Sequence, residues 1–141
     1  MNENVHHLFV TTSHKHWMLT REMCGKEGIP CSPRILFEIA KHEGITQKEL
    51  SMLLCIKPAS VTATLDKLES LNCIYRKTDN KDLRIKRIYI TENGYQMIKK
   101  AETVKEKTNQ LAFKDFTEAE KNSFAQLLLK IEKNLEVANI E

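Results

Sequence analysis

The residues best suited to binding chemistry lie between Lys57 and Thr91, where positive charge is concentrated. This stretch holds eight lysine or arginine residues and four acidic residues, a net charge of +4, whereas the whole chain carries +3. The rest of the chain is therefore close to neutral, and the basic character is local. A local basic patch is the electrostatic footprint expected of a surface that binds nucleic-acid phosphates.

A helix predicted from Pro58 to about Leu71 runs through this basic stretch. Its apolar residues Val61, Leu65 and Leu68 follow the i, i+4, i+7 spacing of a narrow buried stripe. The opposite face and its flanks carry small or polar side chains that have no core to fill: Ala59, Ser60, Thr62, Ala63, Asp66, Lys67 and Ser70. A helix with one apolar stripe and one small, polar face suits the major groove of DNA.

A second helix is predicted immediately upstream. Thr46 and Glu49 form a T-x-x-E capping box, which predicts a helix from Gln47 to about Leu54. A short break at 55–57 follows, and the proline that opens the next helix suits a first turn because its missing N–H is not needed there. The spacing predicts a helix-turn-helix.

A β-hairpin is predicted after this pair of helices. The alternating, β-branched runs 74–78 and 85–91 flank the turn-rich segment 79–82. The hairpin carries the cations Arg76, Lys77, Lys81, Arg84, Lys86 and Arg87. Helix, turn, helix and basic hairpin together predict a winged helix-turn-helix.

The segment 45–91 resembles the winged helix-turn-helix of the MarR family of bacterial transcription regulators. The matching motifs are ITQKEL, SVTATLDKL and RKTDNKDLR followed by IYITENG, in the order and spacing of the family, over about a third of the chain. The resemblance implies a mainly α fold with a small antiparallel β-wing and a homodimer that binds an inverted-repeat operator. It also implies repression as the commoner mode of regulation.

The expected DNA contacts follow from the recognition helix and the wing. In the predicted recognition helix, 58–71, contacts with base edges are assigned to the N-terminal half, at Ala59, Ser60, Thr62 and Ala63. Lys67 is expected nearer the DNA backbone, and phosphate contacts are expected from Lys57, Lys81 and Lys86. Arg84 is expected to enter the minor groove, and Asp82 to brace that arginine or the turn, as the D-x-R pattern of the family suggests. The chain departs from the family at Lys57, where a capping serine is frequent, at Ala63, where arginine is frequent, and at Cys55, where glycine is frequent. Readout is therefore expected to rely more on DNA shape.

Amphipathic helices are predicted on both sides of the winged segment, at about 5–26, 33–41, 95–113 and 118–137. Thr117 and Glu120 form a second capping box at the start of the last of them. The 141 residues suit a single domain, with 32–94 as the DNA-binding unit and 1–31 and 95–141 as dimerisation helices. The chain has no apolar run long enough to span a membrane and no signal-like N-terminus, so a cytoplasmic location is expected.

Candidate sensing residues lie near the expected junction of the dimerisation helices and the winged unit. Cys24 and Cys31 are one pair, for which an inert, core-filling role is the alternative. Trp17, Arg21 and Phe37 are candidates for a small aromatic or lipophilic effector. His14 and His16 diverge on a helix, so neither a metal nor another cofactor is predicted.

Other classes of function fit the sequence less well than DNA binding does. An enzyme is not predicted, because the chain has no nucleophile elbow, phosphate-binding glycine loop or paired carboxylates. A winged-helix protein–protein adaptor would not need its cations concentrated on the helix and wing. A purely architectural DNA binder would show little preference for an operator over random DNA.

Overall fold

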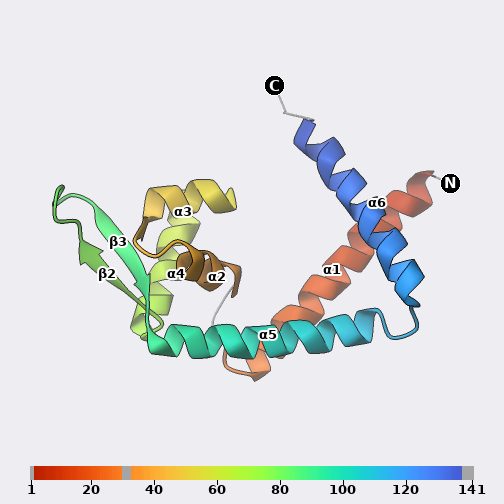
Figure 1. Ribbon diagram of the computed structural model, residues 1–141, viewed down its shortest axis with the longest axis horizontal. Coiled ribbons are helices and arrows are strands. Elements are labelled where there is room, and N and C mark those ends of the chain that lie inside the picture. Colours follow the sequence, from red (N-terminus) through yellow and green to blue (C-terminus); the bar gives the residue numbers. More distant parts are fainter. Residues whose placement is uncertain (1, 30–32, 138–141) are drawn as a thin grey trace. The chain divides into compact units, whose positions relative to one another are not determined.

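The computed structural model describes residues 2–29 and 33–137 and divides into two compact units, Met1–Glu106 and Lys107–Glu141, each described by itself. The mainly helical architecture with a small antiparallel sheet is the predicted one (Figure 1). The elements in chain order are α1 (Asn2–Lys26), α2 (Pro33–Lys41), β1 (Ile45–Thr46), α3 (Gln47–Leu54), α4 (Pro58–Ser70), β2 (Ile74–Thr78), β3 (Lys86–Ile90), α5 (Glu92–Ala112) and α6 (Glu118–Val137).

Local hydrogen bonds set the bounds of α3 and α4, as the sequence predicted. The Thr46 hydroxyl accepts a hydrogen bond from the Glu49 N–H (3.2 Å), and the Glu49 carboxylate accepts one from the Thr46 N–H (2.8 Å). Helix α3 ends at Cys55, which has a left-handed backbone with φ of 52°. Pro58 opens α4, where it needs no hydrogen-bond partner.

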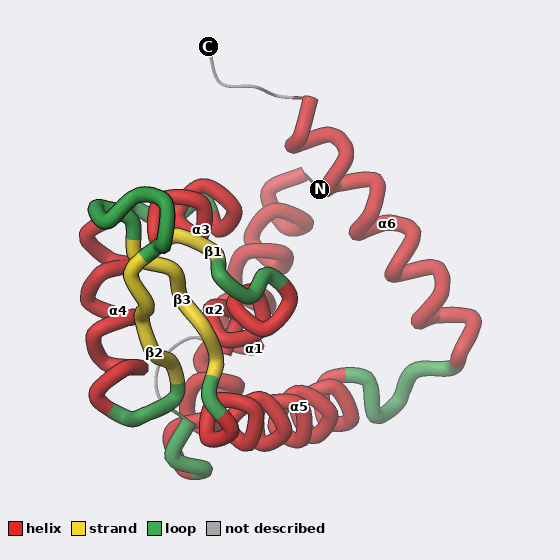
Figure 2. The backbone as a smooth tube through the Cα atoms, turned by 60° about the vertical axis from the view of Figure 1, so that its left-hand side comes forward, coloured by secondary structure: helices red, strands yellow, loops and turns green. Residues whose placement is uncertain are grey.

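The sheet is antiparallel with strand order β1-β3-β2 (Figure 2). Ile74 pairs with Ile90 and Arg76 with Ile88, so these side chains share the face that the helices α2, α3 and α4 cover. The two-residue strand β1 was not predicted, because a strand this short is defined by its pairing with Arg87 and Ile88 rather than by a sequence pattern.

The main hydrophobic core lies between the sheet and α2, α3 and α4. Its fully buried side chains come from every one of these elements and include Leu36, Ile39, Leu50, Val61, Leu65, Leu68, Ile74 and Ile88. The stripe predicted on the recognition helix is thus entirely buried. A smaller cluster of Cys24, Ile29, Ala101 and Val104 joins the end of α1 to α5. The main cluster gives the winged unit a core of its own.

Helix α5 begins at Glu92, three residues before the predicted Tyr95. The Thr91 hydroxyl accepts a hydrogen bond from the Gly94 N–H (3.1 Å) and donates one to the carbonyl of Asn72 (2.6 Å), so this threonine caps the helix. A Cβ on Gly94 would lie 2.2 Å from the carbonyl oxygen of Cys73. Only glycine therefore fits where the first turn of α5 meets the start of β2.

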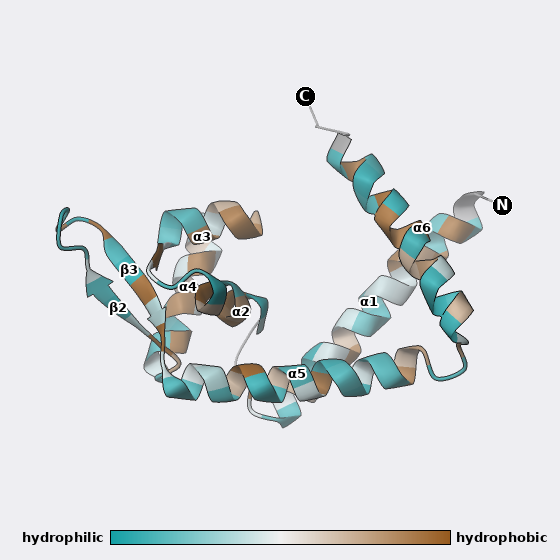
Figure 3. Cartoon of the chain, in the orientation of Figure 1, coloured by the Kyte–Doolittle hydropathy of each residue, from teal (hydrophilic) through white to brown (hydrophobic). Residues whose placement is uncertain are grey.

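Helix α6 lies in the second unit and begins with the predicted capping box of Thr117 and Glu120. Phe113, Phe116 and Phe124 pack around the turn before it. Beyond this cluster the large apolar residues of α6 are exposed, as are those of α1 from Val5 to Leu19 in the other unit. Figure 3 shows hydrophobic and hydrophilic residues interspersed along both helices. None of the described helices is long and apolar enough to span a membrane.

Candidate nucleic-acid interface

The outer face of α4 is free of core contacts. Ala59, Ser60, Ala63 and Lys67 are exposed, whereas Val61 on the opposite side is fully buried. Small side chains along this face allow a close approach to a flat or grooved partner. Lys57 precedes the helix, is exposed, and makes no side-chain capping bond. Its ammonium group is therefore available to a phosphate.

Thr62, expected to contact a base, already uses its hydroxyl within the protein. It donates a hydrogen bond to the Pro58 carbonyl (3.0 Å) and accepts a short one from the Gln47 side chain. The second bond joins the start of α3 to α4. Thr62 therefore fixes the two helices relative to each other, and its methyl group is the part left for a DNA base. Sequence spacing alone gave no sign of this bond between residues fifteen positions apart.

Arg76 has a different role from the other cations of the hairpin. Its Nη2 lies 2.7 Å from Asp66 Oδ1 and its Nη1 lies 3.4 Å from Glu69 Oε2. Both carboxylates belong to α4, so the arginine holds β2 against the helix and balances the negative charge of the outer face. The sequence count treated Arg76 as a free cation and Asp66 as a free polar group. The ion pairs correct both interpretations.

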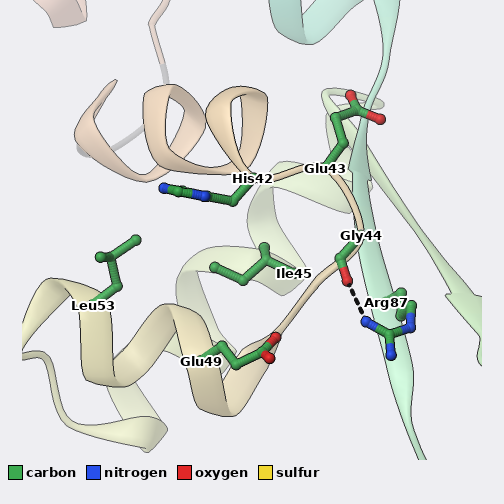
Figure 4. Close-up of a pocket in the computed structure, with 7 residues that line it drawn as sticks. All are labelled: His42, Glu43, Gly44, Ile45, Glu49, Leu53 and Arg87. Atoms are coloured by element: carbon green, nitrogen blue, oxygen red, sulfur yellow. Dashed lines mark hydrogen bonds between the residues drawn. The ribbon is translucent and has the colours of Figure 1, made fainter.

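Arg87 is likewise committed within the protein. Its Nε binds the Asp79 carboxylate and its Nη1 donates to the Gly44 carbonyl (3.0 Å). The hydrogen bond from Arg87, with others from the N–H groups of Asp82 and Lys81, lowers the pKa of Asp79 to about 2. One arginine thus ties the base of the wing to the segment before β1. In Figure 4 it borders an open cavity of about 440 Å³ lined also by His42, Glu43, Ile45, Glu49 and Leu53.

The tip of the wing presents the cations that remain unpaired. Asp82 Oδ1 accepts a hydrogen bond from the Arg84 N–H (3.0 Å), so Asp82 braces the turn rather than the guanidinium. Lys81, Arg84 and Lys86 are exposed and take part in no ion pair within the described chain. The turn is rigid while its charged ends remain free, which is the arrangement that phosphate or minor-groove contact requires.

The candidate sensing residues do not form one site. The Arg21 guanidinium lies 5.2 Å from the centre of the Trp17 ring on α1. Cys24 is buried, which raises the pKa of its thiol, and Phe37 packs against the same small cluster. A buried thiol with a raised pKa is a poor nucleophile, which favours the core-filling interpretation. Cys31 lies outside the described residues.

Comparisons with known proteins agree with this geometry. Residues 32–86 match the model of the MarR family. The HTH-type transcriptional regulator YybA of Bacillus subtilis (strain 168) is 27% identical over 101 residues, which are 72% of this chain and 67% of that protein. The crystal structure of MarR has a TM-score of 0.79 at 23% identity, covering 93% of this chain and 96% of that chain. A mutant MarR from E. coli, complexed with operator DNA, has a TM-score of 0.78 at 23% identity, covering 91% of this chain and 93% of that chain.

The fold is therefore the winged helix-turn-helix fold of these MarR structures. The match of residues 32–86 to the MarR family model confirms the resemblance seen in the sequence. The match to this family agrees with the prediction that the chain is not an enzyme.

Proposed function

We propose that the chain is a sequence-specific regulator that binds double-stranded DNA, with α4 in the major groove and the wing tip in the adjacent minor groove. The observation that carries the proposal is the pairing of an exposed, small-residue face on α4 with unpaired cations at the wing tip. Ala59, Ser60 and Ala63 approach base edges, with the methyl group of Thr62 at their side. Phosphate contacts fall to Lys57, Lys67, Lys81 and Lys86, and Arg84 enters the minor groove.

The regulator acts as a homodimer on an inverted repeat. Exposed apolar residues along α1 and α6 support this assembly, because such stripes need a partner surface in water. The domain division proposed from the sequence follows from the same argument, with 32–94 binding DNA and 1–31 and 95–141 forming the dimer. Two recognition helices in one dimer would read half-sites about 34 Å apart.

Repression, with release by a small-molecule or oxidative signal, is the mode of action we propose. The stacked Trp17 and Arg21 on α1 support an aromatic effector more than they support oxidation, since Cys24 is buried. A ligand that binds one state of the dimer better than the other would shift the population that fits the operator.

The test is a titration of the full chain with duplex DNA from upstream of its own coding sequence and with a scrambled duplex, each at two salt concentrations. We expect a preference of about a thousandfold for the upstream duplex. Arg84→Ala should weaken binding and reduce the slope of log K against log salt by about 1. The matched control is Lys105→Ala, which removes an exposed cation of α5. Repeating the titration with peroxide and then with reductant tests the oxidative signal.

Other outcomes of this titration identify other functions. Equal affinity for both duplexes would indicate an architectural DNA binder. Absence of binding to either duplex, together with retained cellular activity of Arg84→Ala and Lys67→Ala, would indicate a protein–protein adaptor.

A further inference from the structure

The face of the sheet opposite the helices carries a ladder of two aromatic and two cationic residues. Tyr75 pairs across the strands with Tyr89, and Lys77 pairs with Arg87. The two tyrosine rings are stacked, with centroids 5.3 Å apart and planes inclined by 17°. Tyr75 remains 48% exposed, because its strand lies at the edge of the sheet. An aromatic surface is thus held open to solvent by a second ring behind it.

The cationic row of this ladder has an energetic cost within the protein. Like charges directly opposite each other on antiparallel strands destabilise the pair. Arg87 is compensated by Asp79 and the Gly44 carbonyl, but Lys77 has no ion pair in the described part of the chain. Lys77 and Lys81 line a cavity of about 310 Å³ together with Tyr89, Arg87 and Asp79, whose carboxylate is paired with Arg87. An anion in this cavity would remove the repulsion between Lys77 and Arg87.

We propose that this outer face binds single-stranded nucleic acid, with a base stacked on Tyr75 and the neighbouring phosphates at Lys77 and Lys81. Residues two positions apart on a strand, such as Tyr75 and Lys77, lie about 7 Å apart, so a base and its phosphate can be bound side by side. Aromatic platforms beside cations are the common means of binding single strands without reading sequence. An acidic peptide would satisfy the lysines but would gain little from the open face of Tyr75.

This site shares only Lys81 with the surface proposed for duplex DNA, and neither Tyr75 nor Lys77 belongs to that surface. Tyr75 and Lys77 point away from α4, whereas Arg76 between them points toward Asp66 on α4. The single-strand site therefore does not depend on the recognition helix, and the two functions can fail independently.

The experiment measures fluorescence anisotropy of labelled twelve-residue oligo(dT) and oligo(rU) with the full chain at low salt. We expect Tyr75→Ala to weaken binding about tenfold or more, the effect of losing one stacked base, and Tyr75→Phe to retain it. Tyr95→Ala is the matched control, because Tyr95 is 41% exposed but lies outside the ladder. Lys77→Gln should lower the slope of log K against log salt by about 0.7, the value for one phosphate of a single strand.

The proposal is overturned if Tyr75→Ala binds oligo(dT) and oligo(rU) as the unaltered chain does. Binding of duplex DNA without binding of either oligonucleotide also overturns it while leaving the proposed regulator intact. Displacement by dTMP at the same concentration as by oligo(dT) would show a free-nucleotide site instead. Equal displacement by oligo-glutamate from the unaltered chain and from Tyr75→Ala would show a charge patch with no base stacking.

Discussion

The large apolar side chains are mostly buried in the winged unit and mostly exposed in the terminal helices α1 and α6. Between β1 and β3 the large aliphatic residues of the recognition helix are completely buried in a core that these elements build among themselves. In α6, by contrast, Leu127 is 59% exposed, and several neighbours are similarly open. The first region is complete within one chain. The second presents apolar stripes on its surface, which the proposed homodimer would cover.

The ion pairs of the two regions differ in the same way. In the winged unit, Arg76 and Arg87 join different elements of the fold. In the terminal helices of the described chain, the pairs Lys26–Glu22 and Lys121–Glu118 lie within a single helix. Pairs of the second kind support a helix but do not place it. Ion pairs between elements therefore fix tertiary position in the winged unit, whereas the pairs within the terminal helices do not.

The largest expected effect tests whether the winged unit is complete in itself. Leu65→Ala removes a fully buried side chain of α4, and the resulting cavity should lower the free energy of unfolding by about 2–5 kcal/mol. The measurement is urea unfolding followed by circular dichroism at several protein concentrations. Leu53→Ala, at an exposed position of α3, is the control and should change stability little. Equal effects of the two substitutions would contradict the conclusion that the buried core stabilises the winged unit.

The next effect tests whether the terminal helices need a second chain. Leu128→Lys combined with Ile131→Lys places two charges on the exposed stripe of α6. We expect the mass in solution to fall from that of a dimer to that of a monomer, and operator affinity to fall about a hundredfold, because two half-sites are then no longer bound together. Analytical ultracentrifugation and anisotropy measure the two quantities. A dimer that survives both lysines would contradict the proposed assembly.

A smaller effect is expected at the pairing between β2 and α4. Arg76→Gln frees the carboxylates of Asp66 and Glu69 beside the proposed DNA surface, so operator affinity should fall about tenfold, or about 1.4 kcal/mol. Adding Asp66→Asn and Glu69→Gln to the same chain should recover most of the affinity. If the affinity does not recover, the loss in Arg76→Gln arises from a change in the fold and not from the freed negative charge.

The smallest effect concerns the base of the wing and depends on pH. Because Arg87 lowers the pKa of Asp79 from 3.8 to about 2, this carboxylate contributes stability above pH 3.8 that is lost as the pH falls through about 2. In Asp79→Asn this part of the pH dependence should be absent. Urea midpoints measured from pH 5 to pH 2 in both chains make the comparison, with Asp115→Asn in the second unit as the control.

Local sequence signals predicted the parts of the fold that local hydrogen bonds determine. The capping boxes at Thr46 and Thr117 placed the starts of α3 and α6 correctly, since each cap is made by residues three positions apart. The start of α5 was placed at 95 instead of Glu92, because the contacts of Thr91 and Gly94 at this start are with Asn72 and Cys73, which are distant in the sequence.

The parts of the site that depend on distant residues could not be predicted in this way. Exposure of Ala63 and Lys67 followed from the helical period. The folded chain was needed to find the hydrogen bond between Thr62 and Gln47. The same is true of the bonds that Arg87 makes to Asp79 and Gly44. Charge counting identified where cations gather, but not which of them are neutralised by partners elsewhere in the fold.

Position 94 does not tolerate substitution of its glycine. The carbonyl of Cys73 occupies the space in which any other residue would place its first side-chain carbon. A library randomised at this position and selected for folded protein should return glycine alone, whereas neighbouring Tyr95 should accept many replacements. Designers who graft this wing onto another scaffold must therefore carry Cys73, Gly94 and the whole hairpin between them as one part.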